Sequence, residues 1–411
     1  MKLALVSAKF PFGGKEPYLH AELRALAPYF ERIGVFPTSP SDPEWGFADV
    51  AAEVERRGLF APDTLGDAIS ALVTRPRASL AAVGALLRGS RRAVRLKNLA
   101  VVPLGLSLGF RLRRDGFDHV HSYWLSTPAS VAFLAARVAG IPWSSTGHLW
   151  DIYEDNALAL KLPDARFVRA ISARGRRDLL ATPGCAEADV RVIHVGVDVP
   201  DAPPAAASSA AAAPSATDAP SAARPFALLC AANLVPKKGH ADLLEALAEL
   251  RDRGVAVRCT IAGDGELRDA LHAQARALGL GDVVVFRGHV AHAALLGEMR
   301  AGAYDAMVLT SLELPGGLME GIPVALMEAM ALGLPVITTD TGSITELVDD
   351  ACGRVVDQRN VTAVAAAVAE LADDPDLRAE LARAAYEKVE GEFNVVRVAR
   401  ELAAALGAPG A

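Results

Sequence analysis

Residues 313–346 decide the fold of this chain, and they read ELPGGLMEGIPVALMEAMALGLPVITTDTGSITE. Pro323 suits the first turn of a helix, because the N–H that proline lacks would have no intrahelical partner there. Residues 324–331 favour a helix, and Gly333 suits a left-handed cap after its last turn. Since residues 336–339 are typical of a short buried strand, the stretch predicts a helix that leads into a strand.

Two glutamates border the start of this predicted helix. Glu320 lies in the loop that enters it, and Glu328 projects from its second turn. The N-terminus of a helix favours an anion, because its free N–H groups and its macrodipole both point outward. A sugar nucleotide offers hydroxyls to the glutamates and phosphate to the helix end. For this pair alone, two solvated surface glutamates are the alternative interpretation.

Length and charge narrow the class of protein. A chain of 411 residues predicts two domains, each with its own core. The net charge of −7 provides no electrostatic footprint for nucleic acid. The cysteines have no metal-binding spacing and predict buried apolar side chains in a reducing cytoplasm. They are Cys185, Cys230, Cys259 and Cys352. The N-terminal MKLALVSA predicts a first strand rather than a signal peptide.

A glycine loop follows this first strand. Residues 3–7 predict a buried parallel strand, and residues 18–30 have the apolar spacing of a helix. Gly13 and Gly14 lie between them, where backbone N–H groups can approach phosphate or a hydroxyl-rich acceptor. A tight structural turn is the alternative.

A basic segment, residues 75–114, surrounds the apolar run 99–110. Its arginines are Arg75, Arg77, Arg88, Arg91, Arg92, Arg95, Arg111, Arg113 and Arg114. The apolar run is too short to span a bilayer. An internal helix is the favoured interpretation, and peripheral contact with an anionic membrane face is the alternative.

His148 and Asp151 occur in TGHLWDIYEDN, after an apolar-to-polar transition. Such a transition is expected at the carboxyl end of a strand, where open α/β sheets bind their ligands. A lone histidine is usually structural. A histidine three residues before an aspartate at this location is a better candidate for a site.

Residues 201–225 consist mainly of Ala, Pro and Ser and predict a disordered linker, because they cannot bury enough surface to offset their ordering entropy. The predicted domains are therefore 1–200, on the acceptor side, and 226–390, on the nucleotide-sugar side. Residues 391–411 are expected to cross back to the first domain.

Polar residues and glycines of the second domain gather where its predicted strands end. They are Asn233, Lys237, Lys238, Gly263, Gly265, Gly288, Ser311 and Glu320. Regular alternation of strand and helix predicts an α/β fold with two doubly wound parallel sheets, so these residues should share one edge. A lysine beside Gly239 is a point charge for phosphate, and a solvated surface lysine is the alternative.

The segment EGIPVALMEAMALGLPVITT resembles the retaining glycosyltransferase family 4, of the GT-B fold. FPFGGKEPYLHAEL, STGHLWDIY, HVGVDV, IAGDGELRDAL and GSITELV follow that family's order and resemble its bacterial exopolysaccharide and colanic-acid branch. The resemblance implies two Rossmann-like domains facing a cleft. It also implies transfer of a hexose from a nucleoside-diphosphate sugar, as co-substrate, to a lipid-linked or oligosaccharide acceptor. We expect neither a cofactor nor a metal.

The resemblance also implies roles for individual residues. Glu320 would contact the donor sugar beside the reacting carbon, and Glu328 would bind the ribose hydroxyls. Lys238 would neutralise the diphosphate, and His148 would lie by the sugar and the departing phosphate. Further donor-side residues would be Asn233, Lys237, Gly263, Ser311, Gly321 and Ile322, and the loop at Gly13 and Gly14 would meet diphosphate and acceptor.

One departure from the family pattern affects the function. Asn233 stands where the family usually has arginine, so stabilisation of the leaving group should weaken. Lys237 is a candidate to compensate. A catalytically weak sugar-nucleotide-binding assembly or regulatory protein is therefore one alternative, and an epimerase or phosphorylase of the same fold is another. The expected location is the cytoplasm, with the cytoplasmic face of the inner membrane as a further option.

Overall fold

The structure of this chain is a computed structural model. It describes residues 1–12, 16–40, 50–88, 91–203 and 224–411.

The chain forms two compact units. The first is Met1–Gly196 together with Val395–Ala411, and the second is Val197–Asn394. Gly13 and Gly14, and residues 204–223 of the expected linker, lie outside the described residues.

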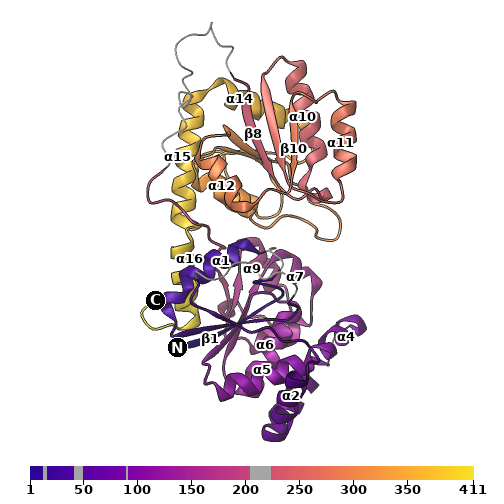
Figure 1. The fold of residues 1–411 in the computed structure, drawn as a ribbon, viewed down its shortest axis with the longest axis vertical. Helices are drawn as coiled ribbons and strands as arrows, with labels where there is room; N and C mark the ends of the chain where they lie inside the picture. Colours follow the sequence, from indigo (N-terminus) through magenta and orange to yellow (C-terminus); the bar gives the residue numbers. More distant parts are fainter. Residues whose placement is uncertain (13–15, 41–49, 89–90, 204–223) are drawn as a thin grey trace. The chain divides into compact units, whose positions relative to one another are not determined.

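The first unit is built on a parallel sheet of seven strands in the order β3-β2-β1-β4-β5-β6-β7, of which Figure 1 labels β1. These strands are β1 Lys2–Ser7, β2 Arg32–Pro37, β3 Glu53–Val54, β4 His119–Ser122, β5 Trp143–Gly147, β6 Val168–Ala170 and β7 Val190–Val192. Its helices are α1 Pro17–Leu26, α2 Pro62–Thr74, α3 Pro76–Leu86, α4 Arg92–Ala100, α5 Val102–Arg114, α6 Thr127–Ala139, α7 Leu149–Glu154, α8 Leu158–Lys161, α9 Ala173–Leu180 and α16 Val395–Leu406.

Alternate residues of β1 pack against opposite layers of helices. Leu3 and Leu5 are buried in a core that includes residues of α1 and α16. Ala4 and Val6 are buried on the other side, with residues of α5 and α6. This period of two is that of a strand covered on both faces, as parallel sheets require.

Two helices of the basic segment, α4 and α5, meet at a bend of 46°. Pro103 lies in the first turn of α5, where its missing N–H costs no hydrogen bond. Within the described ranges, no single helix is long and apolar enough to cross a membrane, although α4 and α5 together pass that test by length and composition. α5 is largely buried, as expected of an internal helix, whereas α4 is mostly exposed.

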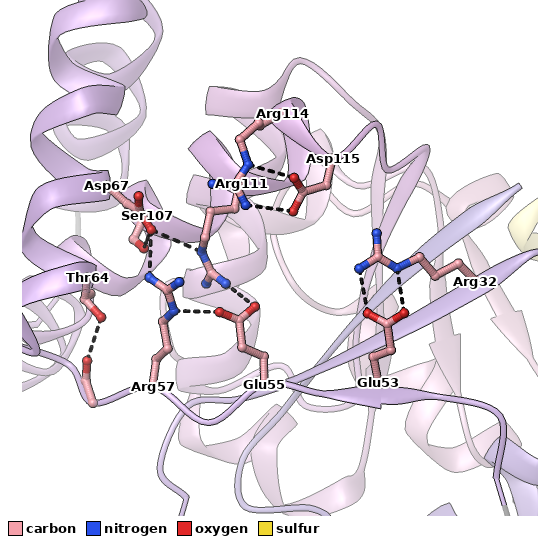
Figure 2. Close-up of polar contacts among 11 residues, drawn as sticks. Arg32, Glu53, Glu55, Arg57, Thr64, Asp67, Ser107, Arg111, Arg114 and Asp115 are labelled. Carbon is pink, nitrogen blue, oxygen red and sulfur yellow. Dashed lines mark hydrogen bonds and ion pairs between the residues drawn. The ribbon is translucent and has the colours of Figure 1, made fainter.

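Ion pairs attach α2 and α5 to the edge of this sheet (Figure 2). Arg57 contacts Glu55 at 2.6 Å and Asp67 at 2.7 Å. The buried Arg111 forms ion pairs with the same two carboxylates. Burial lowers the pKa of Arg111, although both carboxylates act to raise it.

The second unit is built on a parallel sheet of six strands in the order β10-β9-β8-β11-β12-β13. These strands are β8 Phe226–Ala231, β9 Val257–Ala262, β10 Val284–Gly288, β11 Ala306–Leu309, β12 Val336–Thr339 and β13 Arg354–Val356. Its helices are α10 His240–Asp252, α11 Arg268–Ala277, α12 His292–Arg300, α13 Val324–Ala331, α14 Val361–Asp373 and α15 Pro375–Glu392. The prediction of two doubly wound parallel sheets is confirmed.

The helix predicted over residues 324–331 is α13. It begins at Val324, so Pro323 lies one position before the first turn, and that detail of the prediction is wrong. Pro323 has an extended ψ of 119°, and its carbonyl accepts hydrogen bonds from the N–H groups of Leu326 and Met327. It therefore caps the helix. Gly333 has a φ of +72°, which confirms the predicted left-handed residue.

The sequence of residues 190–199, VRVIHVGVDV, predicts a strand over the whole segment, but the strand that forms is shorter. β7 ends at Val192. The chain then passes so close to Val395 that a Cβ on Gly196 would lie 2.5 Å from its Cα. Val197 forms an isolated bridge with Asn394. Because this part of the chain approaches residues 394–395, it does not continue along the sheet.

Candidate functional site

Glu320 is the centre of the candidate site in the second unit. It follows β11, and its carboxylate contacts two lysines from the loop that follows β8. Lys237 Nζ lies 2.9 Å from Oε1, and Lys238 Nζ lies 2.9 Å from Oε2. The Glu320 side chain is only 8% exposed. The two loops lie at the same edge because β8 and β11 are parallel neighbours.

The charge balance at this site favours an ionised glutamate. Burial raises the pKa of Glu320, but Lys238 and Lys237 lower it by a larger combined amount, so the pKa lies below its usual value. Two ammonium groups share one carboxylate, which leaves one positive charge in excess. An anion with several oxygens, such as a diphosphate, can therefore be attracted to the lysines without displacing Glu320.

Backbone hydrogen bonds hold the two loops together. The N–H of Leu312 donates to the Lys237 carbonyl at 2.8 Å. Lys237 Nζ donates to the Met319 carbonyl at 3.3 Å. Ser311 is fully buried, and no partner of its hydroxyl is found among the described residues. The site residues are thus positioned by main chain as well as by charge.

Gly342 allows the loop after β12 to pass against Glu320. Its φ is +62°, and a Cβ there would lie 1.8 Å from the Glu320 carbonyl oxygen. Only a residue without a side chain fits both conditions. Gly321 and Ile322, which the resemblance places at the donor, lie between Glu320 and the cap of α13 and are partly buried.

Gly263 packs one loop against another. A Cβ on Gly263 would lie 1.9 Å from the Ala232 carbonyl oxygen, and one on Gly265 would lie 2.5 Å from the Leu234 carbonyl oxygen. These glycines therefore bring the loop after β9 against the loop that carries the exposed Asn233. Close packing of the two loops is thus the role of these glycines in the structure.

Glu328 has a partner that sequence reasoning missed. Its Oε1 lies 2.7 Å from Nε2 of His292, the first residue of α12, and the two side chains are 17% and 40% exposed. The hydrogen bond to Glu328 raises the pKa of His292, against the opposing effect of burial. Nearby Asp198 also raises this pKa, and Arg300 lowers it. No local motif identifies His292, because it precedes Glu328 by 36 residues.

Replacement of His292 by asparagine should change the pH dependence of stability. The pKa of His292 is raised in the folded state, so its stabilising contribution is fully present below the ordinary value of 6.5 and is lost as pH rises through the folded pKa. We expect the difference in Tm between wild type and His292→Asn to be largest below pH 6.5 and to shrink at higher pH. Thermal melts across this range check it, with His289→Asn as the control. A pH-independent difference would contradict the ion pair.

His148 lies in the first unit, at the N-terminus of α7. Its ring stacks on Trp124 with centroids 4.1 Å apart, and Nε2 lies 3.3 Å from the Tyr18 hydroxyl. Burial lowers the pKa of His148 to about 3, so the imidazole is neutral at physiological pH. A neutral imidazole can accept a hydrogen bond from a sugar hydroxyl. Trp124 and Tyr18 were not among the predicted site residues.

Asp151 fixes the position of His148. One carboxylate oxygen accepts a hydrogen bond from the backbone N–H of His148 at 2.8 Å, and the other accepts one from the backbone N–H of Leu125 at 2.6 Å. The buried Lys161 donates to the Leu125 carbonyl at 2.8 Å. Burial raises the pKa of Asp151 to about 8 and lowers that of Lys161 to about 7. Asp151 therefore ties together the loops that carry His148 and Trp124.

The candidate residues thus form two separate groups. Lys237, Lys238 and Glu320 contact one another in the second unit, where Glu328 lies on α13. His148 belongs to the first unit.

Comparison with protein families adds one match. The family model for glycosyl transferases group 1 matches residues 217–388. The matched range contains the four candidate side chains Lys237, Lys238, Glu320 and Glu328.

Two curated relatives show sequence similarity. WcaL of Escherichia coli K12, whose name provisionally assigns it as a colanic acid biosynthesis glycosyltransferase, is 36% identical over 55% of this chain. The match covers 52% of WcaL, so the chain spans about half the length of that relative. A GDP-mannose-dependent alpha-(1-6)-phosphatidylinositol monomannoside mannosyltransferase of Mycobacterium tuberculosis is 29% identical over 76% of this chain and 82% of its own length.

Solved structures share the fold. HepE of Anabaena, crystallised with UDP, has a TM-score of 0.69 at 19% identity and covers 99% of this chain and 100% of its own. Sucrose-phosphate synthase of Thermosynechococcus elongatus has a TM-score of 0.69 at 18% identity, covering 98% and 97% of the two chains. The predicted GT-B fold class, with two Rossmann-like units, is confirmed.

Proposed function

Because residues 217–388 of this chain match the family model for glycosyl transferases group 1, we propose that the chain moves a hexose from a nucleoside-diphosphate sugar to a lipid-linked or oligosaccharide acceptor. Synthesis of exopolysaccharide or another cell-surface glycan is the proposed context. The similarity to WcaL supports this context. The UDP bound by HepE supports a nucleotide-sugar donor.

The observation that carries the proposal is the contact of Glu320 with Lys237 and Lys238 at the carboxyl edge of a parallel sheet. A nucleotide sugar presents a diphosphate beside sugar hydroxyls. Two ammonium groups next to a buried, ionised carboxylate match that pattern, because the lysines attract the diphosphate and the carboxylate accepts hydroxyl hydrogen bonds.

In the proposed reaction, the bond between the anomeric carbon and the diphosphate oxygen breaks, and its electron pair leaves with the diphosphate. The oxygen of the acceptor hydroxyl bonds to the anomeric carbon on the same face, so the configuration is retained. The proton of that hydroxyl passes to the departing diphosphate. Charge develops on the diphosphate in the transition state, where Lys238 and Lys237 stabilise it.

Other residues have supporting roles in this proposal. Glu328 binds the ribose hydroxyls while His292 holds its carboxylate in place at 2.7 Å. His148 of the first unit accepts a hydrogen bond from a sugar hydroxyl. Lys237 contributes the positive charge that an arginine at position 233 would have supplied.

A panel of nucleoside-diphosphate sugars tests the proposal. The full chain is incubated with each donor, with and without a lipid-linked acceptor, and released nucleoside diphosphate is measured. We expect one donor to give acceptor-dependent release and to raise Tm by mass action. Binding of a donor without turnover, even with acceptors of both classes present, would reject the enzyme.

The second candidate function, a catalytically weak binding protein, is favoured only by the exposed asparagine at position 233. Asn233→Arg discriminates between the two. A weak binder would gain turnover from the restored guanidinium, whereas an enzyme in which Lys237 compensates would change little.

A further inference from the structure

The charge of the first unit is distributed unevenly. Every charged residue between Asp67 and Asp115 is basic, although the chain has a net charge of −7. Some of these residues serve the fold. Arg111 forms ion pairs with Glu55 and Asp67, and Arg114 forms one with Asp115. Others have no such role. Among the described residues, no ion-pair partner is found for the exposed Arg77, Arg88, Arg92 and Arg95.

Large aliphatic side chains are exposed on α2 and α4. On α2, Leu65, Ile69 and Val73 are 41%, 60% and 74% exposed, and their spacing of four residues places them on one face. On α4, Leu96 and Leu99 are 61% and 52% exposed.

Arginines accompany the exposed leucines at helical spacing. Arg92 and Arg95 precede Leu96 and Leu99 by four residues each, so all four share one face of α4. On α3, Arg77 lies three residues before Leu80, which is also exposed.

All three helices pack on α5 or α6. α2 packs on α5, α3 packs on α6, and α4 contacts both α5 and α6. Figure 1 shows α2 and α4 at the end of the first unit away from its sheet. We define the α2–α4 surface as Leu65, Ile69, Val73, Arg77, Leu80, Arg88, Arg92, Arg95, Leu96 and Leu99.

We propose that the α2–α4 surface docks this chain on an anionic lipid bilayer. Guanidinium groups pair with lipid phosphates, and the aliphatic side chains enter the boundary between headgroups and acyl chains. A nucleic acid offers phosphate but no apolar phase for exposed leucines, isoleucine and valine. The surface therefore fits a bilayer better than it fits DNA or RNA.

Docking at this surface would bring the first unit's site near lipid. Arg91 donates to the Glu154 carbonyl at 3.0 Å, and Lys97 contacts the Glu154 carboxylate at 2.8 Å, so α4 is tied to α7. α7 begins directly after His148 and exposes Trp150, a residue type enriched at membrane interfaces. This inference rests on the proposed function only for its purpose, which is access to a lipid-linked acceptor.

Co-sedimentation with vesicles tests the docking. The full chain is mixed with vesicles of phosphatidylcholine alone or of phosphatidylcholine with phosphatidylglycerol. We expect binding to the anionic vesicles that weakens with salt. Arg92→Gln with Arg95→Gln should lower the partition coefficient about 30-fold, which corresponds to about 1 kcal/mol per arginine. Leu96→Ser with Leu99→Ser should lower it roughly tenfold.

The matched control is Arg276→Gln with Arg400→Gln, which removes the same charge from exposed positions outside this surface. It should bind as wild type does. Thermal melts verify that each variant folds. Absence of wild-type binding to anionic vesicles, or an equal loss in the control, would overturn the docking surface.

A transfer assay with detergent-dispersed acceptor separates this inference from the proposed function. Transfer without vesicle binding would reject the docking surface alone. Suppose that wild type binds anionic vesicles, that Arg92→Gln with Arg95→Gln weakens this binding as expected, and that no donor supports transfer. This result would support the docking surface and reject the transferase.

Discussion

Glu320→Ala should abolish glycosyl transfer while the chain stays folded. The carboxylate is 8% exposed and holds both lysine ammonium groups at 2.9 Å, so its loss frees Lys237 and Lys238 from their positions. Glu320→Gln keeps the shape but removes the charge, and we expect kcat to fall about 100-fold or more, the usual cost of losing one electrostatic group at a reacting centre. Release of nucleoside diphosphate measures both variants.

Glu380→Ala is the matched control, because Glu380 is an exposed glutamate on α15 of the same unit. It should keep the wild-type rate. Lys238→Ala should also abolish transfer, since it removes the ammonium group that contacts Oε2. A rate close to wild type in Glu320→Ala or in Lys238→Ala would refute the assigned site.

Glu22→Ala should destabilise the first unit by about 3–5 kcal/mol, the cost of leaving one partner of a buried ion pair alone. Glu22 lies on α1, and its two oxygens accept from Arg169 of β6 at 2.6 and 2.8 Å. Both side chains are 1% exposed. Arg169 also donates to the Ile193 carbonyl at 2.8 Å. The pair thus joins α1, β6 and the segment after β7, and urea denaturation measures its loss.

An exposed pair in the same unit provides the comparison. Arg32 binds Glu53 through two hydrogen bonds of 3.2 and 2.6 Å, as Figure 2 shows. The Glu53 side chain is 67% exposed, so Glu53→Ala should cost less than about 1 kcal/mol. Replacing both buried partners, Glu22→Leu with Arg169→Met, should recover part of the stability. Equal losses of unfolding free energy in Glu22→Ala and Glu53→Ala would show that burial does not increase the cost of breaking an ion pair.

Local patterns predicted most of the elements around the candidate site. The helix at 324–331 and the strand at 336–339 have the bounds expected from the sequence. Propensity, caps and apolar runs act over a few residues, so they are visible without tertiary structure. The expectation failed for residues 190–199, because packing against Val395 ended the strand early.

Contacts between distant residues could not be predicted in the same way. Trp124 stacks on His148, and Asp151 links their two loops. The sequence placed His148 and Asp151 at a strand end but offered no sign of Trp124 as a partner. Its position depends on the neighbouring order of β4 and β5 in the sheet.

By itself, the sequence determined the α/β class, the two sheets and the stretch at 313–346 with its two glutamates. Only the tertiary structure decided what those glutamates contact: two lysines for Glu320 and His292 for Glu328. The physical reason is the distance along the chain over which each effect acts. Backbone preferences are set by neighbours in the chain, whereas the pairing of buried charges depends on which strand ends the folded sheet brings to one edge.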